Sequence, residues 1–510
     1  MAARACGMAV AGVAGAPTAA SRPAPVARAP GLCQGRAVSN PGQPHVVVVG
    51  GGIAGLAAAF FLREAPCRVT VLEGSPRPGG KLRVSEIAGI AVDEGAEALL
   101  ARRPEGTGLA AAAGLAGQLV WPGTTVARIW SRGRMCPLPR HQVLGVPADL
   151  TELAGTGLVS EDGMARARQD LGLPATGRDG DVPVAGFVAA RFGPEVVDRL
   201  VDPLLAAVYA GRSEELSFDA TLPALAAESR KHASLAEAAT AVLPDPAGPG
   251  PAATPVFTTL AGGLGTLPAA VAAASGSCVR TGAMVRGLAR TATGWRLTVG
   301  SAHDAEYLAA DAVILAVPAA PAARLLGGVP GASAAMAALQ EIRYASMAIA
   351  TLAYPAAAFP GPLEGSGYLV PAADGRAVKA VTFSTVKWPH LADGGAGPVI
   401  VRCSLGRVGE EALLQSGDAE LAGLAAADLA AATGASGAPL ATRVTRWGGG
   451  LPQYTVGHLD RVARIRSAVA AQPGLAVCGA AYDGIGIPAC VATARAAAAQ
   501  IAAHLSDDRQ

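Results

Sequence analysis

The sequence predicts an α/β protein with a parallel sheet close to its N-terminus. Residues 46–49 are four consecutive valines, a run typical of a strand that is buried on both faces. A glycine-rich turn follows, and residues 56–62 then have the apolar composition of a helix start. Residues 68–72 form a second strand-like segment. Strand, helix and strand in this order make the unit from which parallel sheets are built.

The composition of the 510 residues excludes several classes of protein. Lys and Arg number 41 and Asp and Glu 39, so the net charge of +2 gives no basic field that would attract nucleic acid. We expect no transmembrane helix, because the sequence lacks the long, strongly apolar run that a membrane span needs. None of the eight cysteines forms a C-x-x-C pair or a zinc-type spacing with histidine, which favours buried free thiols over a metal site or disulfides.

Residues 1–45 differ from the rest of the chain. They contain four arginines, many small residues and no acidic residue. A segment of this composition buries little apolar surface, so we expect a disordered extension. Its composition fits a transit peptide, which would direct the protein to a plastid, but we favour an extension that has no targeting function. The expected location is therefore the cytoplasm, with peripheral association with a membrane left open.

The turn after the first strand has the spacing G-x-G-x-x-G. Gly50 permits a tight turn, Gly52 lets a pyrophosphate approach the backbone, and Gly55 lets the helix pack closely on the strand. The second strand ends at Glu73, 23 residues after Gly50, where an acid binds the hydroxyls of a ribose. These features together predict a dinucleotide site. An acid at this place disfavours a 2′-phosphate, so FAD and NAD remain as alternatives.

The segment that begins at Glu73 distinguishes between these two cofactors. Glu73, Arg77, Gly79, Gly80 and Lys81 have the spacing E-x-x-x-R-x-G-G-[RK]. This spacing resembles the superfamily of amine oxidases, phytoene desaturases and protoporphyrinogen oxidases. The resemblance implies that the arginine and the paired glycines lie along the pyrophosphate and ribityl chain of a non-covalently bound FAD. An ordinary surface turn is the alternative interpretation.

Two further parts of the chain resemble the same superfamily, one over residues 257–285 and the other from Trp447 to residue 505. Residues 475–478 are a short apolar strand, followed by a loop rich in glycine and by an alanine-rich helix over 491–505. The resemblance implies that this loop meets the flavin ring, that Trp447 lies near the ring, and that Val285 touches the adenine. For Trp447, an ordinary core position is the alternative. The cofactor residues implied by these two parts are Val285, Trp447, Gly479, Gly486, Ile487 and Pro488.

The resemblance implies an α/β fold with a discontinuous, glutathione-reductase-like Rossmann-type FAD domain, a helical domain and a sheet-based substrate domain. The composition over 221–241 and over 411–433 favours helices. The expected boundaries are residues 46–145, 256–325 and 440–505 for the FAD domain, 150–255 for the helical domain, and 325–440 for the substrate-binding domain.

A narrower resemblance concerns the substrate. Four segments resemble the porphyrinogen oxidases, and the K-W-P-H stretch from Lys387 resembles their Gram-positive bacterial, coproporphyrin-forming type. The resemblance implies that Arg128 holds a substrate carboxylate, that Leu369 and Trp388 contact the macrocycle, and that Lys387 adds positive charge at its rim. The alternative for Arg128 is an exposed arginine on a strand, and the alternative for Trp388 is a buried core tryptophan. The four segments are residues 193–197, 202–204, 208–211 and 477–490.

The reaction that this resemblance implies needs no catalytic side chain, and we find no Ser, His, Asp or Cys constellation that would supply one. The expected chemistry is hydride transfer from a methylene bridge of coproporphyrinogen III to flavin N5, with O2 as the acceptor. Three rounds give coproporphyrin III and three H2O2, a step of haem synthesis. Residues 93–97, which include three carboxylates, are expected to form a solvated turn rather than an acid–base pair.

Other functions stay open at this point. A protoporphyrinogen IX oxidase would act on a dicarboxylate, whereas coproporphyrinogen III is a tetracarboxylate and needs more cations, to which Arg132, Arg134 and Lys379 could contribute. An amine oxidase, a carotenoid desaturase and a non-catalytic FAD-binding scaffold are the remaining alternatives. Transient contact with a membrane surface or with haem-pathway enzymes is compatible with the sequence, which does not determine the oligomeric state.

Overall fold

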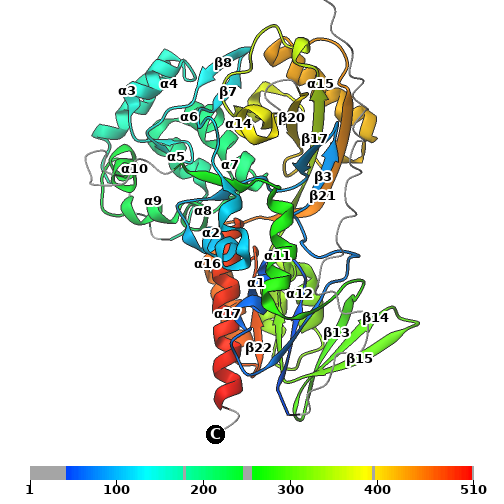
Figure 1. Cartoon of the computed structure of the whole chain (residues 1–510). Helices are drawn as coiled ribbons and strands as arrows, with labels where there is room; N and C mark the ends of the chain where they lie inside the picture. The colour runs from blue at the N-terminus through cyan, green and yellow to red at the C-terminus, as the bar shows by residue number, and fades with distance from the viewer. Residues whose placement is uncertain (1–41, 176–177, 179, 245–254, 393–396, 508–510) are drawn as a thin grey trace, which may run out of the picture.

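The computed structural model describes residues 42–175, 178, 180–244, 255–392 and 397–507. Figure 1 shows a lower part with the C-terminal helix and an upper part with helices on one side and a large sheet on the other. The predicted extension over 1–41 lies outside the described residues. Its predicted end at residue 45 is wrong, because His45 begins the first strand and is 2% exposed. A single histidine gives no sequence signal of burial; here its ring bonds to Thr70 and to the backbone of Ala309.

The lower part is built on a five-stranded parallel sheet with the order β12-β2-β1-β16-β22. Its strands come from three distant segments of the chain. They are β1 (His45–Val49), β2 (Arg68–Leu72), β12 (Cys278–Arg280), β16 (Ala312–Leu315) and β22 (Leu475–Val477). The predicted strand, helix and strand unit is therefore confirmed, with α1 (Ile53–Phe61) as its helix.

Both faces of this sheet are covered, which explains the run of valines in β1. Val46 and Val48 pack against α1, α11 (Leu267–Ser275) and α17 (Ile487–Asp507). Val47 and Val49 face the other way. On that side lie α12 (Ala319–Leu326), α13 (Ser333–Gln340), α16 (His458–Ala470) and the antiparallel sheet of β13 (Val285–Thr291), β14 (Gly294–Gly300) and β15 (Ala305–Ala310).

The upper part contains a seven-stranded sheet with the order β21-β17-β20-β19-β18-β7-β8. Helix α15 (Asp418–Thr433) covers its outer face. The strands are β7 (Arg128–Ser131), β8 (Arg134–Pro137), β17 (Tyr344–Tyr354), β18 (Gly367–Leu369), β19 (Val378–Phe383), β20 (Val399–Leu405) and β21 (Ala441–Pro452). Thus β7, β8 and β21 join a sheet outside the segment assigned to them, because a strand pattern does not specify the partner strand.

The helices of the upper part lie beside this sheet (Figure 1). The helix expected over 221–241 is interrupted, because Ser234 starts a new helix by accepting from the backbone N–H of Glu237. The helix expected from residue 411 starts only at Asp418, after Gly417. The helices of this group are α3 (Leu150–Thr156), α4 (Glu161–Arg168), α5 (Val184–Phe192), α6 (Pro194–Val196), α7 (Asp202–Tyr209), α8 (Phe218–Thr221), α9 (Pro223–Glu228) and α10 (Leu235–Val242).

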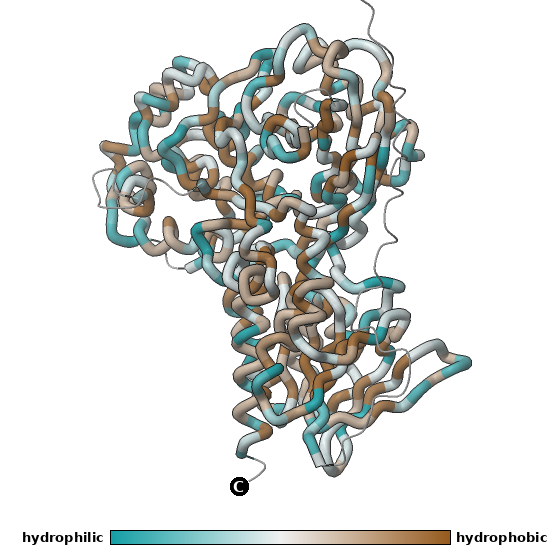
Figure 2. The backbone as a smooth tube through the Cα atoms, in the orientation of Figure 1, coloured by the Kyte–Doolittle hydropathy of each residue, from teal (hydrophilic) through white to brown (hydrophobic). Residues whose placement is uncertain are grey.

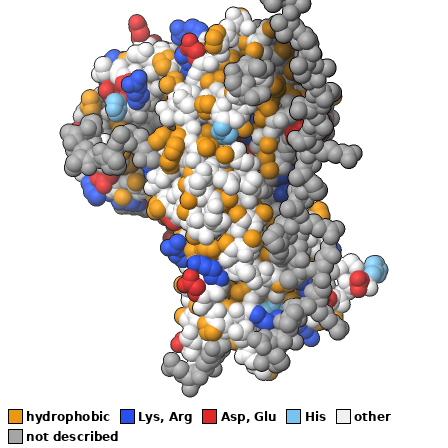
Figure 3. Space-filling view, in the orientation of Figure 1, with side chains coloured by type: hydrophobic (Ala, Val, Ile, Leu, Met, Phe, Trp, Pro, Cys, Tyr) orange, Lys and Arg blue, Asp and Glu red, His pale blue; other side chains and the backbone are white. Residues whose placement is uncertain are grey.

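Shorter elements join the two parts. Figure 2 shows that hydrophobic residues concentrate along strands and on the helices that cover them. On the coloured areas of the face in Figure 3, Lys and Arg stand in small groups and form no continuous basic surface. None of the helices in the described part of the chain has the length and hydrophobicity of a membrane span. The joining elements include β3 (Val84–Ile87), β4 (Ile90–Asp93), β5 (Leu99–Leu100), β6 (Leu119–Val120), β11 (Phe257–Leu260) and α2 (Pro104–Ala110). Helix α14 (Ser384–Lys387) lies within the upper part, between β19 and β20.

Candidate active site

The three glycines of the first turn differ in what surrounds them. Gly50 has φ +108°, and a Cβ there would lie 2.5 Å from the carbonyl oxygen of Ala316. A Cβ on Gly55 would lie 1.9 Å from the carbonyl oxygen of Gly50, so the helix packs directly on the turn. A Cβ on Gly52 would meet nothing within 4 Å. The turn therefore leaves open space only at Gly52, where an approaching phosphate needs it.

Glu73 lies at the carboxyl end of β2, beside the glycine turn. Its carboxylate accepts from the backbone N–H of Gly51 over 2.7 Å and of Ser75 over 2.8 Å. Its carbonyl oxygen accepts from the backbone N–H of Ala283 over 2.8 Å, which brings Val285 at the start of β13 to the same edge of the sheet. The predicted ribose and adenine residues, Glu73 and Val285, thus lie at one end of the nucleotide turn.

The second pair of glycines lies against the first turn. The backbone N–H of Gly79 donates to the carbonyl oxygen of Gly51 over 2.8 Å, and a Cβ on Gly80 would lie 3.3 Å from the Cα of Gly52. Both Gly79 and Gly80 have positive φ. The guanidinium of Arg77 bends toward the carbonyl oxygen of Gly80, and burial followed by repulsion from Arg83 lowers its pKa. This arrangement fits a pyrophosphate, which needs N–H groups and a cation together.

Lys81 and Trp447 meet beside this turn. A Cβ on Gly95 would lie 2.0 Å from the carbonyl oxygen of Lys81 and 3.1 Å from Cζ2 of Trp447, so only glycine fits between them. The indole N–H of Trp447 donates to the carbonyl oxygen of Glu94 over 3.0 Å. Burial lowers the pKa of Lys81. The seven-stranded sheet therefore touches the nucleotide region through Trp447 of β21.

The C-terminal loop reaches the same edge of the parallel sheet. The backbone N–H of Gly479 donates to Oγ1 of Thr493 over 3.0 Å, and a Cβ on Gly479 would lie 3.7 Å from that of Ala54 in α1. Beyond Gly486, residues Ile487 and Pro488 form the first turn of α17. Because β1 and β22 run parallel in one sheet, the helices that follow them begin at the same edge. Two positively polarised helix ends meet there.

The inner face of the seven-stranded sheet is the face that packs against the helices of the upper part. Leu369 of β18 is partly buried and packs against the hydrophobic cluster of α5 and α7, and so does Ile485 of the C-terminal loop. Ala380, Thr382 and Ser404 on the same inner face are also only partly buried. The C-terminal loop, which is predicted to meet the flavin ring, and the predicted substrate residue Leu369 therefore contact the same group of helices.

Arg128 points to the other face of the sheet. Its strand partner is Tyr368, which packs in the outer core with α15, whereas Leu369 pairs with Ile129 on the inner face. Nη2 of Arg128 lies 2.7 Å from Oε2 of Glu364, in an ion pair whose side chains are 32% and 76% exposed. The structure does not bring the side chains of Arg128 and Leu369 together. Arg132 pairs with Glu195, and Arg134 donates to the carbonyl oxygen of Gly157.

Lys387 is part of a group of three charges, of which Arg402 is buried and Lys387 and Glu97 are partly buried. The Nζ of Lys387 lies 2.7 Å from Oε1 of Glu97, whose other oxygen binds Arg402 of β20. Burial alone would raise the pKa of Glu97, but the charges of Lys387 and Arg402 outweigh it and hold that pKa at about 2. The ammonium also lies 5.1 Å from the ring centroid of Trp388, which is 2% exposed, and 5.6 Å from that of Phe257.

The prediction that residues 93–97 form a solvated turn is wrong. Asp93 is 5% exposed and Glu94 is 2% exposed. Asp93 accepts from the backbone N–H groups of Leu264 and Gly265, both over 2.9 Å, while burial raises its pKa to about 6. A cluster of acids is usually solvated, and the partners that bury this cluster come from distant segments that no local pattern identifies.

Lys379 is a further buried cation and lies at an irregularity in the pairing of β19 with β20. It is 1% exposed, and its ammonium donates to the carbonyl oxygen of Gly406. Burial, followed by repulsion from Arg407, lowers its pKa to about 7. The unfolded chain therefore binds more protons than the folded protein between about pH 7 and the ordinary lysine pKa of about 10.4.

We expect the free energy of unfolding to rise with pH over this window, by at most about 1.4 kcal/mol per pH unit from this group. Lys379→Met removes that contribution, so the stability of the variant depends less on pH between pH 7 and 9. Urea denaturation at several pH values checks this, with Lys231→Met on an exposed side chain as the control. Equal pH slopes in Lys379→Met and the wild type would contradict the lowered pKa.

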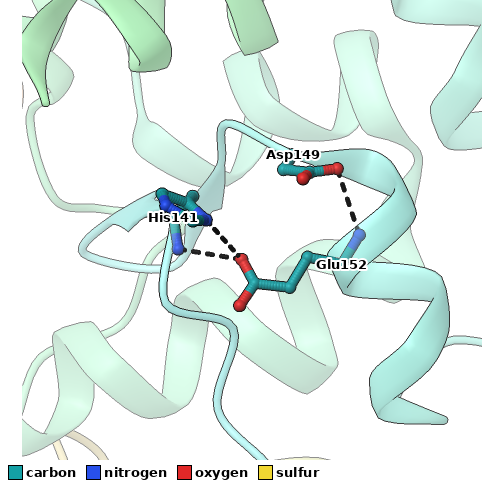
Figure 4. A group of neighbouring side chains, drawn as sticks. All are labelled: His141, Asp149 and Glu152. Atoms are coloured by element: carbon teal, nitrogen blue, oxygen red, sulfur yellow. Dashed lines mark hydrogen bonds and ion pairs between the residues drawn. The ribbon is translucent and has the colours of Figure 1, made fainter. Parts of the chain in front are cut away.

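One group of His, Asp and Glu side chains in the described ranges has its ligand atoms close enough for a metal, namely His141, Asp149 and Glu152 (Figure 4). Each carboxylate has another role. Asp149 caps α3 by accepting from the backbone N–H groups of Thr151 and Glu152. Glu152 accepts from the backbone N–H groups of Arg140 and His141 and bonds to the His141 ring. The group is accounted for by helix capping and loop bonding, and we assign it no metal.

Three further polar residues, Gln453, Tyr454 and His458, are buried, and no sequence motif identified them. Gln453 and Tyr454 follow β21, and His458 is the first residue of α16; together they contact the helices of the upper part and the C-terminal loop. The local signal available was a group of polar side chains, which usually indicates an exposed loop. Only the tertiary contacts show otherwise.

A model of the family described as flavin containing amine oxidoreductase matches residues 53–502. The chain belongs to this family, which defines it as a flavoprotein oxidoreductase. The same fold occurs in a putrescine oxidase structure, with a TM-score of 0.65 and 17% identity over 90% of this chain and 99% of that one.

More similar proteins narrow the class. The chain is 39% identical to the coproporphyrinogen III oxidase of Mycobacterium tuberculosis (strain ATCC 25618 / H37Rv), over 88% of this chain and 95% of that protein. It is 32% identical to the coproporphyrinogen III oxidase of Bacillus subtilis (strain 168), over 91% and 99%. A structure from Exiguobacterium sp. 255-15, provisionally named a protoporphyrinogen oxidase, has a TM-score of 0.79 and 31% identity over 90% and 99%. The predicted membership in the porphyrinogen oxidases, of the type found in these bacteria, is confirmed.

Proposed function

We propose that the chain oxidises coproporphyrinogen III to coproporphyrin III with non-covalently bound FAD and O2, as a step of haem synthesis. The observation that supports the proposal is that Leu369 and Ile485 pack against one helical cluster, from which we infer that the inner sheet face and the C-terminal loop line one site. The relatives named coproporphyrinogen III oxidase supply the substrate class.

The residues at the edge of the parallel sheet fit FAD. The open space at Gly52 and the amide of Gly80 would receive the pyrophosphate, with Arg77 as its cation. Glu73 would bind the ribose, and the backbone near Val285 the adenine. The N-terminus of α17 would stabilise negative charge on the flavin, and it is placed there by Gly479, Gly486, Ile487 and Pro488. Lys81 and Trp447 would complete the wall of the FAD site.

The bound FAD would accept a hydride in each of three rounds, in which six electrons reduce three O2 to three H2O2. The protein residues hold the macrocycle and exclude water. Leu369 and Trp388 would supply apolar surface, and Lys387 positive charge near the rim. For Arg128 the role in binding a substrate carboxylate stays a prediction, because its side chain lies on the outer face of the sheet, away from Leu369, and pairs with Glu364.

Oxidation of protoporphyrinogen IX is the second candidate. The chain is 31% identical to the protoporphyrinogen oxidase of Bos taurus, over 89% of this chain and 98% of that protein. Several basic side chains that would serve a tetracarboxylate are already paired, namely Lys387 with Glu97 and Arg132 with Glu195. In either case we propose a cytoplasmic protein, with transient contact with a membrane surface or with haem-pathway enzymes.

Separate assays with coproporphyrinogen III and protoporphyrinogen IX test the function. The FAD-loaded protein is mixed with each substrate in air, and porphyrin fluorescence is followed. We expect faster oxidation of coproporphyrinogen III, with three H2O2 formed per porphyrin. Faster oxidation of protoporphyrinogen IX would favour the second candidate. A rate equal to the control without protein for both substrates would refute a porphyrinogen oxidase.

A further inference from the structure

The segment between β21 and α16 connects the helices of the upper part to the flavin loop. Nε2 of Gln453 donates to the carbonyl oxygen of Tyr209 over 2.8 Å. The backbone N–H of Ser217 donates to the carbonyl oxygen of Tyr454 over 2.8 Å. A Cβ on Gly211 would lie 2.2 Å from Oε1 of Gln453, so this glycine lets the two regions approach. The start of the segment is therefore fixed to the helical group at several points.

The hydroxyl of Tyr454 binds the loop that joins β22 to α17, at both ends of residues 480–484. It donates to the carbonyl oxygen of Ala480 over 2.6 Å and accepts from the backbone N–H of Gly484 over 2.8 Å. The side chain is buried, and Gly484 has φ +143°, a conformation that favours glycine. The Tyr454 hydroxyl thus binds both ends of the turn over residues 480–484, which comes shortly before α17.

His458 fixes both the tyrosine and the middle of the loop. Its ring stacks on that of Tyr454, with a centroid distance of 3.9 Å and an interplanar angle of 14°. Its Nε2 lies 2.9 Å from the carbonyl oxygen of Tyr482. Burial lowers the pKa of His458 to about 4, so the ring is neutral at pH 7, and its Nε2–H donates to that carbonyl oxygen. The loop is therefore held at Ala480, Tyr482 and Gly484 by two stacked side chains.

We propose that Tyr454 is a positioning residue for the flavin: it sets the loop over 480–484, and with it the N-terminus of α17, at the distance the flavin ring requires. This inference rests on the proposed function in that the cofactor is FAD. A helix terminus stabilises charge only within its first turn, so a small shift of the loop changes the electrostatic stabilisation of the flavin. Since the same segment binds Tyr209 and Ser217, it also keeps the flavin loop in register with the helices that pack against Leu369.

Hydrogen exchange on the full-length, flavin-loaded protein provides the first test. Tyr454→Phe keeps the ring and its stacking but removes both hydrogen bonds of the hydroxyl. Because a hydrogen bond contributes about 1 kcal/mol, which corresponds to about a 5-fold change in an equilibrium constant, we expect the amide of Gly484 to exchange about 5-fold faster than in the wild type. Tyr368→Phe is the matched control, since this tyrosine is equally buried and its hydroxyl has no hydrogen-bond partner in the described part of the chain. Equal exchange at Gly484 in the two variants would overturn the proposal.

The midpoint potential of the bound flavin provides the second test, since a purely structural role would not change it. We expect Tyr454→Phe to lower the potential, because a displaced helix end stabilises the reduced cofactor less, and Tyr368→Phe to leave it unchanged. Faster exchange at Gly484 with an unchanged potential would show that the loop is held for stability alone and would also overturn the proposal. Neither measurement uses a porphyrinogen, so both decide the role of Tyr454 even if the protein oxidises neither substrate.

Discussion

Gly52→Val is expected to abolish FAD binding without disturbing the fold. Gly52 has φ −72° and ψ 177°, which any residue adopts, and a Cβ there meets nothing within 4 Å in the protein. The valine side chain would instead fill the space beside Gly79 and Gly80 that we assign to the pyrophosphate. We expect the affinity for FAD to fall by at least about 100-fold, a loss of about 2.7 kcal/mol. Fluorescence titration of the flavin-free protein measures this.

Two comparisons make the result specific. Gly423→Val, in the exposed part of α15 and equally free of neighbours within 4 Å, should bind FAD as the wild type does. Thermal unfolding of the flavin-free proteins should be the same for Gly52→Val and the wild type. If Gly52→Val bound FAD with unchanged affinity, the pyrophosphate would not lie on this turn. If the variant unfolded instead, the space at Gly52 would be needed by the protein itself.

The nucleotide turn was predictable because its determinants are local. Gly50, Gly52, Gly55 and Glu73 lie within one strand, helix and strand unit, and their spacing follows from the geometry of that unit. The strands β1, β16 and β22 of the parallel sheet are also short apolar runs that stand out in the sequence. The sequence did not determine the sheet to which a strand belongs, because β21 and β7 have patterns that suit either sheet.

The substrate-binding residues were harder to predict, because the face of the sheet on which a side chain lies depends on distant packing partners. Arg128 lies on the outer face since its neighbour Ile129 packs against the helices, and a shift by one residue would reverse this. The burial of Glu97 likewise depends on Lys387 and Arg402, which lie about three hundred residues further along the chain. Charged residues are usually exposed, so sequence alone favours the wrong environment for such a group.

Glu97→Gln is expected to destabilise the protein by about 3–5 kcal/mol. The substitution keeps the shape of the side chain but removes the carboxylate that Lys387 and Arg402 share, two cations whose side chains are only 16% and 6% exposed. Breaking a buried ion pair from one side has a cost of this size, because the remaining charge stays desolvated. Urea denaturation at pH 7 measures the loss. Adding Lys387→Met to Glu97→Gln should recover part of it, since one of the two unpaired charges is then removed.

The pH dependence of this loss follows from the pKa of Glu97, which lies at about 2 in the folded protein against an ordinary value of 4.5. For a depressed carboxyl pKa, the stabilising contribution is complete above the unfolded value and disappears as the pH falls toward the folded value. The difference in stability between the wild type and Glu97→Gln should therefore be constant above about pH 5 and shrink below pH 4.5. Glu364→Gln, which removes an exposed partner of Arg128, should change stability by less than about 1 kcal/mol at any pH. A loss as small for Glu97→Gln would mean that water reaches the group of three charges.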